Sequence, residues 1–223
     1  HIDHAARLQT AVAAQMVTPS AWMRAWPLAE DSRLPAGQAV LPNLLAASAR
    51  PMPEAAVRRA TGSTRPIREL VFFGRLEPRK GLDSFCAAVT LLAARGLRPA
   101  KVTFLGRLDR ESGAEELLEA RHAWPFPSQV IEGYDSQTAL RALLESETLA
   151  VIPSRRDNLP YTVYECLANG VPMIAAPVGG VPELVHPDDR ARALVEPTAE
   201  ALALAMASAL DQGFQPGRLA FNP

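Results

Sequence analysis

Short apolar runs alternate with helix-like stretches from residue 69 to residue 212, and this alternation constrains the fold more than any other feature of the chain. Each run is about four to six residues long, which is typical of β-strands. The runs lie at residues 70–74, 102–106, 130–133, 149–153, 172–176 and 193–196. Most of them are continuously apolar, which indicates strands buried on both faces of a sheet.

The stretches between these runs have the features of helices. The first carries a one-sided apolar stripe at Leu82, Phe85, Val89 and Leu92. Ser136 and Thr198 each stand where a side chain that caps the start of a helix is expected. Gly170 stands where a helix that begins near Thr162 is expected to end.

Strands joined in this way by helical crossovers predict the fold class. Six such strands favour an α/β protein with a Rossmann-like, doubly wound parallel sheet. In sheets of this kind, ligands bind beyond the carboxyl ends of the strands. We therefore expect the chemistry of this chain in the loops that follow strands.

Residues 1–66 differ from the rest because prolines interrupt them repeatedly. Residues 5–14 are predicted to form a helix, and residues 16–18 and 39–41 are candidates for short strands. We interpret this part as the closing elements of a second Rossmann-like domain, followed by a linker.

The predicted division is therefore as follows: 1–48, tail of an amino-terminal domain; 49–66, linker; 67–212, main domain; 213–223, tail. The chain starts with His1 and has no basic region followed by an apolar one, so we expect no signal peptide. The absence of an initiator methionine suggests a fragment of a longer protein.

Composition excludes several classes of function. Lysine and arginine total 23 against 24 acidic residues, so the net charge is −1 and sequence-independent nucleic-acid binding is not expected. No apolar run approaches the roughly 18 residues of a membrane span. Both cysteines, Cys86 and Cys166, fall in segments predicted to be helical, so we expect buried free thiols and a cytoplasmic location.

The first candidate loop, residues 74–81, follows the first predicted strand. Its glycines flank three cations, Arg75, Arg79 and Lys80. A helix start favours anions, and arginine can hold phosphate oxygens with two parallel hydrogen bonds, so the loop could cradle a diphosphate. A solvated basic turn is an equally good interpretation from spacing alone, because the loop matches neither common glycine-rich nucleotide motif.

The second candidate loop, residues 153–165, follows the fourth predicted strand and carries Asp157 and Glu165. A carboxylate about one turn into a helix, as Glu165 is, can accept hydrogen bonds from the two vicinal hydroxyls of a ribose. The alternative is that Asp157 pairs with Arg155 or Arg156 and that Glu165 caps the helix.

Taken together, the loops and their neighbours resemble the carboxyl-terminal half of retaining glycosyltransferases of the family 4 type, which have the GT-B fold of two facing Rossmann-like domains. The resemblance extends in order over most of residues 67–196. The similar segments are 74–81, 102–106, 130–134, 157–165, 168–172 and 178–183, and residues 18–20 and 40–43 look like the end of that family's first domain.

The resemblance implies a role for each candidate residue. Arg75 and Lys80 would contact the donor diphosphate, and Glu165 would hold the ribose. Asp157 would meet the transferred sugar and stands where the family usually has glutamate. Six further residues would border the ligand: Asn158 and Leu159 at the sugar, and Gly106, Arg107, Tyr134 and Asp135 at the base. The segment 158–161 departs from the family's usual pattern.

The expected function is transfer of a sugar from a nucleoside diphosphate to an unknown acceptor with retention, in polysaccharide or glycolipid synthesis. Neither metal nor cofactor is expected, and Arg75, Lys80 and Asp157 would act in catalysis. Because acceptors in the resembling family normally dock on the first domain, we expect the fragment alone to be inactive. A contact with the inner face of the membrane through that domain is a further expectation. The alternatives are a non-catalytic nucleotide-sugar binding module, a phosphorylase or an epimerase.

Two further segments are given structural interpretations. Gly179 and Gly180 are expected to permit a tight turn, with a ligand role only secondary, and residues 188–190 are expected to form a solvated loop. His122 and His186 have no partners at the spacing of metal ligands.

Overall fold

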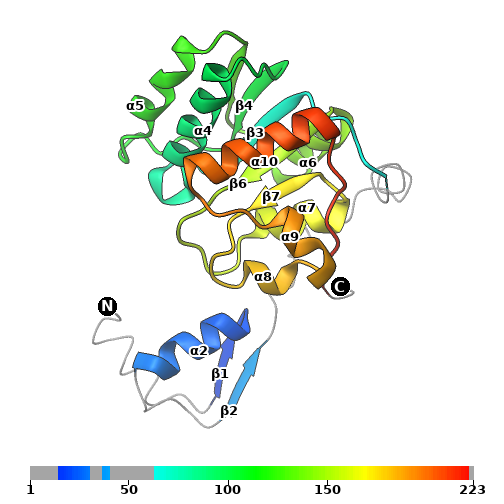
Figure 1. The fold of residues 1–223 in the computed structure, drawn as a ribbon. Coiled ribbons are helices and arrows are strands. Elements are labelled where there is room, and N and C mark those ends of the chain that lie inside the picture. Colours follow the sequence, from blue (N-terminus) through cyan, green and yellow to red (C-terminus); the bar gives the residue numbers. More distant parts are fainter. Residues whose placement is uncertain (1–14, 31–36, 41–62, 221–223) are drawn as a thin grey trace.

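The structure, a computed structural model, describes residues 15–30, 37–40 and 63–220 (Figure 1). The helix expected at residues 5–14 and nearly all of the predicted linker lie outside these residues. The described part consists of a large α/β unit and a small amino-terminal element.

The large unit is built on a parallel sheet, as the apolar runs predicted. Its strands are β3 (Glu69–Phe73), β4 (Lys101–Leu105), β5 (Ser128–Ile131), β6 (Thr148–Ile152) and β7 (Met173–Ala175). They lie in the order β5-β4-β3-β6-β7, and all neighbours are parallel. The strand order reverses between β3 and β6, so the loops after these two strands border the crevice in which doubly wound sheets bind ligands.

The prediction of a sixth strand at residues 193–196 is wrong. Ala193 ends the short helix α9 (Arg190–Ala193), and Leu194 forms a single bridge with Ala175. The backbone N–H of Val195 donates to the carbonyl of Ala175 at 2.9 Å. Because Ala175 is the last residue of β7, the residues after Leu194 have no part of β7 left to pair with.

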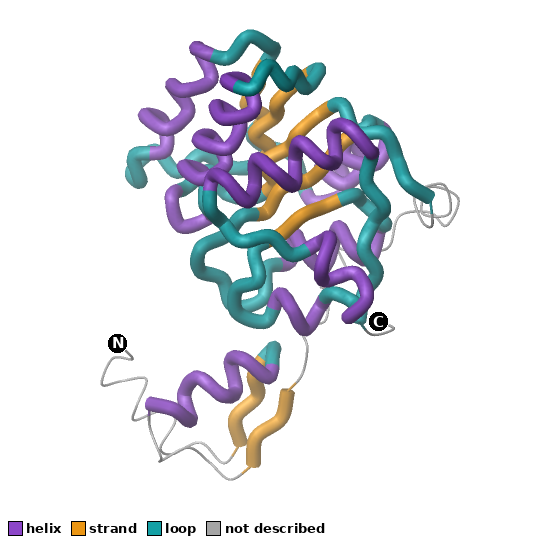
Figure 2. The backbone as a smooth tube through the Cα atoms, viewed as in Figure 1, coloured by secondary structure: helices purple, strands orange, loops and turns teal. Residues whose placement is uncertain are grey.

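Helices cover both faces of the sheet (Figure 2). They are α4 (Leu82–Ala94), α5 (Ala114–Leu118), α6 (Ser136–Glu145), α7 (Tyr161–Asn169), α8 (Val181–Leu184), α9 and α10 (Ala199–Gln212), with 3-10 turns η1 (Pro78–Lys80), η2 (Glu119–Ala123) and η3 (Pro187–Asp189). Leu70 and Phe72 pack toward α4 and α10, whereas Val71 and Phe73 pack toward α6 and α7. This division follows from the alternation of side chains along a strand.

The helix boundaries confirm two of the three predicted end signals. The Thr198 hydroxyl accepts from the Ala201 N–H at 3.3 Å, and α7 ends at Asn169, just before Gly170. The prediction for Ser136 is wrong, because the neighbouring Asp135 carboxylate caps α6 by accepting from Thr138 N–H at 2.7 Å. That hydrogen bond from the Thr138 backbone lowers the pKa of Asp135.

The amino-terminal element has the β-α-β form expected of the closing part of a Rossmann-like domain. It consists of β1 (Gln15–Thr18), α2 (Ala21–Glu30) and β2 (Gly37–Val40). The two strands pair in parallel in a sheet of their own. The strand candidates at residues 16–18 and 39–41 are thus confirmed, the second with its last residue outside the described part.

Both cysteines are buried and free, as predicted. Burial, reinforced by the charge of Asp83, raises the pKa of Cys86 to about 12. Burial and the charge of Glu165 raise the pKa of the Cys166 thiol well above its usual value. Since the thiolate is the reactive form, both side chains act as protonated core residues.

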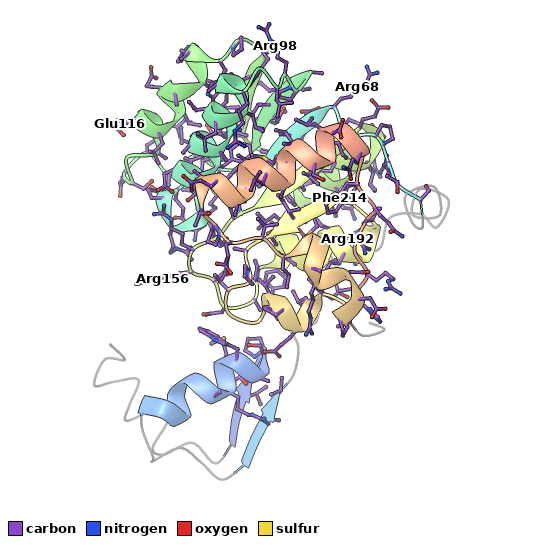
Figure 3. The ribbon with its side chains drawn as sticks, viewed as in Figure 1. Arg68, Arg98, Glu116, Arg156, Arg192 and Phe214 are labelled. Carbon is purple, nitrogen blue, oxygen red and sulfur yellow. The ribbon has the colours of Figure 1, made fainter. Side chains whose placement is uncertain are left out.

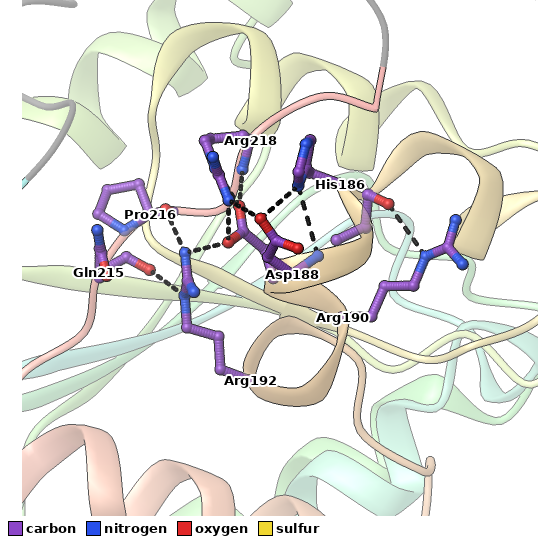
Figure 4. A network of polar contacts seen from close by, with 9 residues as sticks. His186, Asp188, Arg190, Arg192, Gln215, Pro216 and Arg218 are labelled. Atoms are coloured by element: carbon purple, nitrogen blue, oxygen red, sulfur yellow. Dashed lines mark hydrogen bonds and ion pairs between the residues drawn. The ribbon is translucent and has the colours of Figure 1, made fainter.

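The expectation of a solvated loop at residues 188–190 is wrong for Asp189. Its side chain is only 2% exposed and forms ion pairs with Arg192 and Arg218. Figure 4 shows the surrounding network, in which Arg192 and Arg218 join η3 to the carboxyl-terminal segment. The Asp189 carboxylate accepts from the backbone N–H of Arg218 at 2.8 Å and from Arg218 Nε at 2.9 Å. Arg192 Nη2 lies 2.8 Å from the other carboxylate oxygen. The network fastens residues 214–220 to the domain.

Replacing Asp189 with asparagine is expected to lower the free energy of unfolding by about 1.5–3 kcal/mol at neutral pH, the range of hydrogen bonds to charged groups. Burial raises the pKa of Asp189, but the hydrogen bonds from Arg218 and the charges of Arg192 and Arg218 outweigh it, so the pKa lies below its ordinary value. The stabilisation is therefore complete above the unfolded pKa of about 3.9 and is lost as the pH falls through the lower folded pKa.

Urea unfolding of both proteins from neutral pH downward measures this difference, which should shrink once the pH falls below the unfolded pKa of about 3.9. Asp188→Asn is the matched control, because Asp188 also contacts Arg218 but its side chain is 72% exposed. An exposed pair contributes about 0.2–1 kcal/mol, so an equal loss in the two variants would contradict the assignment to Asp189.

Candidate functional site

The two candidate loops lie against each other at the carboxyl ends of β3 and β6. The backbone N–H of Arg155 donates to the carbonyl of Arg79 at 3.0 Å, and Arg79 Nη1 donates to the carbonyl of Arg156 at 3.1 Å. The Arg156 label in Figure 3 marks this region, at the edge of the large unit. The loops are therefore joined before any ligand binds.

An ion pair between Lys80 and Asp157 connects the loops at their centre. Lys80 Nζ contacts Asp157 Oδ2 directly, and the two side chains are only 17% and 13% exposed. The other carboxylate oxygen accepts from the backbone N–H of Asn158 at 3.0 Å. The alternative that Asp157 pairs with Arg155 or Arg156 is thus wrong, since Arg155 contacts Asp83 and Ser84 instead.

A buried carboxylate orients the arginines of the first loop. Glu77 Oε1 lies 3.3 Å from Arg75 Nη2 and 2.7 Å from Arg79 Nη2. The Glu77 side chain is 9% exposed, whereas that of Arg75 is 56% exposed and free to meet a ligand on its other edge. This role of Glu77 was not predicted from the sequence, although an acidic residue in the middle of a basic loop is a signal for it.

A cavity of about 490 Å³ opens over these loops, and this volume lies in the range of small-molecule sites. Five of the predicted residues line it together: Arg75, Lys80, Asp157, Asn158 and Leu159. Pro19, just before α2, and Met23, in the first turn of α2, also line it. The cavity thus combines two cations, a carboxylate and apolar surface from both parts of the chain.

Glu165 lies in α7 outside the residues that line this cavity. Its side chain is buried, and Oε1 accepts a hydrogen bond from the Ser136 hydroxyl at the start of α6. The interpretation of Glu165 as a capping group is wrong, because α7 begins after Pro160 and has no side-chain cap. Glu165 instead joins α7 to the turn that contains Tyr134 and Asp135.

A second cavity of about 410 Å³ adjoins the first through Arg75, which lines both. Arg107 and Glu132 also line it. Glu132 accepts from the Leu108 N–H at 2.9 Å, and this bond, together with Arg110, lowers the pKa of the exposed Glu132 carboxyl.

The remaining predicted residues do not line either large cavity. Gly106 donates its N–H to the Ile131 carbonyl at 3.0 Å. Tyr134 lines a smaller space of about 200 Å³ beside Ile131, and Asp135 is engaged as the cap of α6. The structure therefore brings the diphosphate and sugar candidates together, but not the four candidates for the base.

The sequence of residues 56–221 matches the family described as glycosyl transferases, group 1. The chain belongs to this family. A D-inositol 3-phosphate glycosyltransferase from Saccharomonospora viridis is 30% identical over 67% of this chain and 36% of its own length. An MMP alpha-(1->4)-mannosyltransferase from Mycolicibacterium hassiacum is 34% identical over 54% of this chain and 28% of its own length. The chain spans about a third of the curated relatives it matches.

Solved structures agree with the fold. A sucrose-phosphate synthase from Thermosynechococcus elongatus superposes with a TM-score of 0.65 at 22% identity, covering 92% of this chain and 51% of the other. A trehalose-6-phosphate protein from E. coli, bound with UDP-2-fluoro glucose, gives 0.67 at 13% identity, covering 94% and 55%. These similarities place the large unit in the GT-B architecture.

In this chain of the group 1 family, the charged side chains of the first cavity determine which ligands it can bind. Arg75 and Lys80 can neutralise an anion that enters, and Asp157 can accept hydrogen bonds from hydroxyls. Within residues 15–30, 37–40 and 63–220, no group of three His, Cys, Asp or Glu side chains is placed to hold a metal ion. No described helix combines the length and apolar composition needed to cross a membrane.

Proposed function

We propose that this chain is the donor-binding part of a glycosyltransferase that binds a nucleoside-diphosphate sugar and transfers the sugar with retention. One observation carries the proposal: Arg75, Lys80 and Asp157 share one cavity at the point where the strand order reverses, in a chain of the group 1 family. The nucleotide-sugar analogue bound to the structurally similar E. coli protein supports this donor class.

In the proposed reaction, the two cations bind the diphosphate and stabilise the negative charge that grows on it as the glycosidic bond breaks. Such positioned charges are worth most when they interact more strongly with the transition state than with the ground state. The departing phosphate takes the acceptor's proton, so the proposal needs no separate base. It also assigns no metal or cofactor.

Asp157 is proposed to meet a hydroxyl of the transferred sugar. In the structure, one of its oxygens holds Lys80 and the other accepts from the Asn158 N–H. The oxygen that holds Lys80 also accepts from the Ser154 hydroxyl at 3.4 Å. A carboxylate oxygen has two lone pairs, so the oxygen that accepts from Asn158 can accept one further hydrogen bond. The ion pair of Lys80 and Asp157 would thus hold the donor at both its diphosphate and its sugar.

The acceptor is proposed to be a sugar or lipid intermediate of polysaccharide or glycolipid synthesis at the inner face of the membrane. One relative from Escherichia coli, 28% identical over 66% of this chain, is described as a putative colanic acid biosynthesis glycosyltransferase. In the GT-B architecture the acceptor meets the facing domain, so the present chain alone is proposed to bind donor without transferring it.

A panel of nucleoside diphosphates and their sugars, tested by thermal shift, examines donor binding directly. A ligand at a hundred times its dissociation constant stabilises a protein by about 2.7 kcal/mol, which is easily measured. Assay of the full-length protein then separates a transferase from a non-catalytic binding module, which would bind donor and release no nucleoside diphosphate. A requirement for inorganic phosphate as co-substrate would indicate a phosphorylase instead.

The proposed ribose contact predicts that Glu165→Gln weakens a nucleoside diphosphate and its sugar conjugate alike, by about five- to tenfold. This range is the difference between charged and neutral hydrogen bonds. Because only the ribose hydroxyls would feel Glu165, the loss should vanish for the 2′,3′-dideoxynucleoside diphosphate. Calorimetric titration of both proteins with the three ligands measures these affinities.

Glu145→Gln is the control for this experiment, because Glu145 is an exposed glutamate at the end of α6. Glu165 also holds Ser136, so its variant can lose stability. A lower melting temperature with unchanged affinity for all three ligands would assign Glu165 a structural role alone.

A further inference from the structure

Residues 179–183 connect the loop that carries Asp157 with the amino-terminal element. On the loop side, the backbone N–H of Gly180 donates to the carbonyl of Asn158 at 2.7 Å. Gly179 lies so close to the same loop that an added Cβ would be 2.0 Å from the carbonyl oxygen of Asp157. A shift of this segment therefore cannot leave the loop unchanged.

On its other side, the same segment binds the start of α2. Glu183 Oε2 accepts from the backbone N–H of Ala21 at 2.8 Å, and Oε1 accepts from the N–H of Trp22 at 2.8 Å. The first four N–H groups of a helix have no partner within the helix, and a negative charge is favourable there. The Glu183 carboxylate, more than 160 positions away in the sequence, satisfies two of them.

Close packing accompanies these hydrogen bonds. Ser20 is 1% exposed, and a Cβ added to Gly180 would lie 2.7 Å from the Cβ of Ser20. The Ser20 hydroxyl accepts from the N–H of Met23 at 3.0 Å, so a third amide of the first turn is satisfied locally. Figure 1 shows the result, with α2 lying beside α8.

The start of α2 and the residue before Ser20 also form a wall of the 490 Å³ cavity, because Pro19 and Met23 line it together with Lys80 and Asp157. The position of this wall depends on contacts made by residues 180 and 183. The amino-terminal element could be placed elsewhere only by breaking the two Glu183 hydrogen bonds and exposing Ser20.

We propose that Glu183 is a positioning residue that holds the start of α2 over the donor cavity and so couples the arrangement of the two parts of the chain to donor binding. Because its two oxygens accept from two consecutive amides, Glu183 fixes both the distance of α2 from α8 and the direction of α2. The coupling to donor rests on the proposed function, whereas the attachment of α2 is independent of it.

The attachment is tested by backbone hydrogen exchange at Ala21 and Trp22 in the unliganded 223-residue chain. Glu183→Ala removes both acceptors and should raise exchange at these amides by about tenfold or more, the scale of a lost charged hydrogen bond. Glu183→Gln keeps one oxygen and should give an intermediate rise. Glu145→Gln, with its exposed glutamate, is the control and should change neither amide. Unchanged exchange in Glu183→Ala would overturn the proposal.

The coupling is tested by titrating the same variants with UDP, GDP and ADP. Whichever nucleoside diphosphate binds the unaltered chain should bind Glu183→Ala about three- to tenfold more weakly, with Glu183→Gln between the two. Faster exchange with unchanged affinity would show that α2 is held there but does not serve the donor, which overturns the positioning role. If none of the three binds the unaltered chain, the proposed function fails, and the exchange result still decides the attachment.

Discussion

Replacing Lys80 with alanine is expected to weaken the binding of a nucleoside diphosphate by about 10- to 150-fold, the effect of losing a charged hydrogen bond worth about 1.5–3 kcal/mol. The loss should be this large because the Lys80 side chain is only 17% exposed, so water cannot readily replace it. The variant also leaves the Asp157 carboxylate unpaired, and its charge then repels the ligand. Isothermal titration calorimetry of the two proteins measures the change.

Lys101→Ala is the matched control, because Lys101 pairs with Glu69 at 3.3 Å and does not line the cavity. The double variant Lys80→Ala/Asp157→Asn separates the two causes of the loss. Removing the carboxylate removes the repulsion, so affinity should recover in part. Full recovery would contradict a contact between Lys80 and the diphosphate, since it would mean that Lys80 only neutralises Asp157.

The elements of the sheet could be predicted because each is encoded locally. A buried parallel strand is a short apolar run wherever it occurs, and β3, β4 and β6 match their predicted runs to within one residue. The failed sixth strand had the same composition as the others. Its pairing stops after one bridge, because Arg190–Ala193 is helical and β7 ends at Ala175, so only Leu194 can pair. No local pattern reports where a partner strand ends.

The difference between local patterns and contacts made by the tertiary fold also explains which site residues could be predicted and which could not. Arg75, Lys80 and Asp157 could be grouped before the structure was known only through the family resemblance of their motifs. The sequence did not predict that β3 and β6 are neighbours, which is why their loops meet. Two contacts that join distant segments could not be anticipated: Asp189 with Arg218, and Glu183 with the amides of α2. In each case one carboxylate among many is selected by the tertiary fold alone.

Gly179 is required for a local and for a tertiary reason, because its backbone conformation and its contact with the loop of Asp157 both demand glycine. Its φ of +57° lies in the left-handed region, which confirms the expected turn, and its missing side chain admits the carbonyl of Asp157. Gly179→Ala is therefore expected to lower the free energy of unfolding by about 2–5 kcal/mol, the sum of left-handed strain of about 1–2 and overpacking of about 1–3. Urea unfolding measures the loss.

Gly96→Ala separates the two contributions, because Gly96 has a φ of +76° and nothing within 4 Å of an added Cβ. It should lose only the strain of about 1–2 kcal/mol. The excess loss in Gly179→Ala then comes from the displaced backbone of Asp157, so this variant should also bind a nucleoside diphosphate more weakly, whereas Gly96→Ala should bind it normally. Equal losses of stability in the two variants would mean that the loop of Asp157 can be displaced with no loss of free energy of unfolding. The segment 179–183 could then not transmit the position of α2 to the donor cavity.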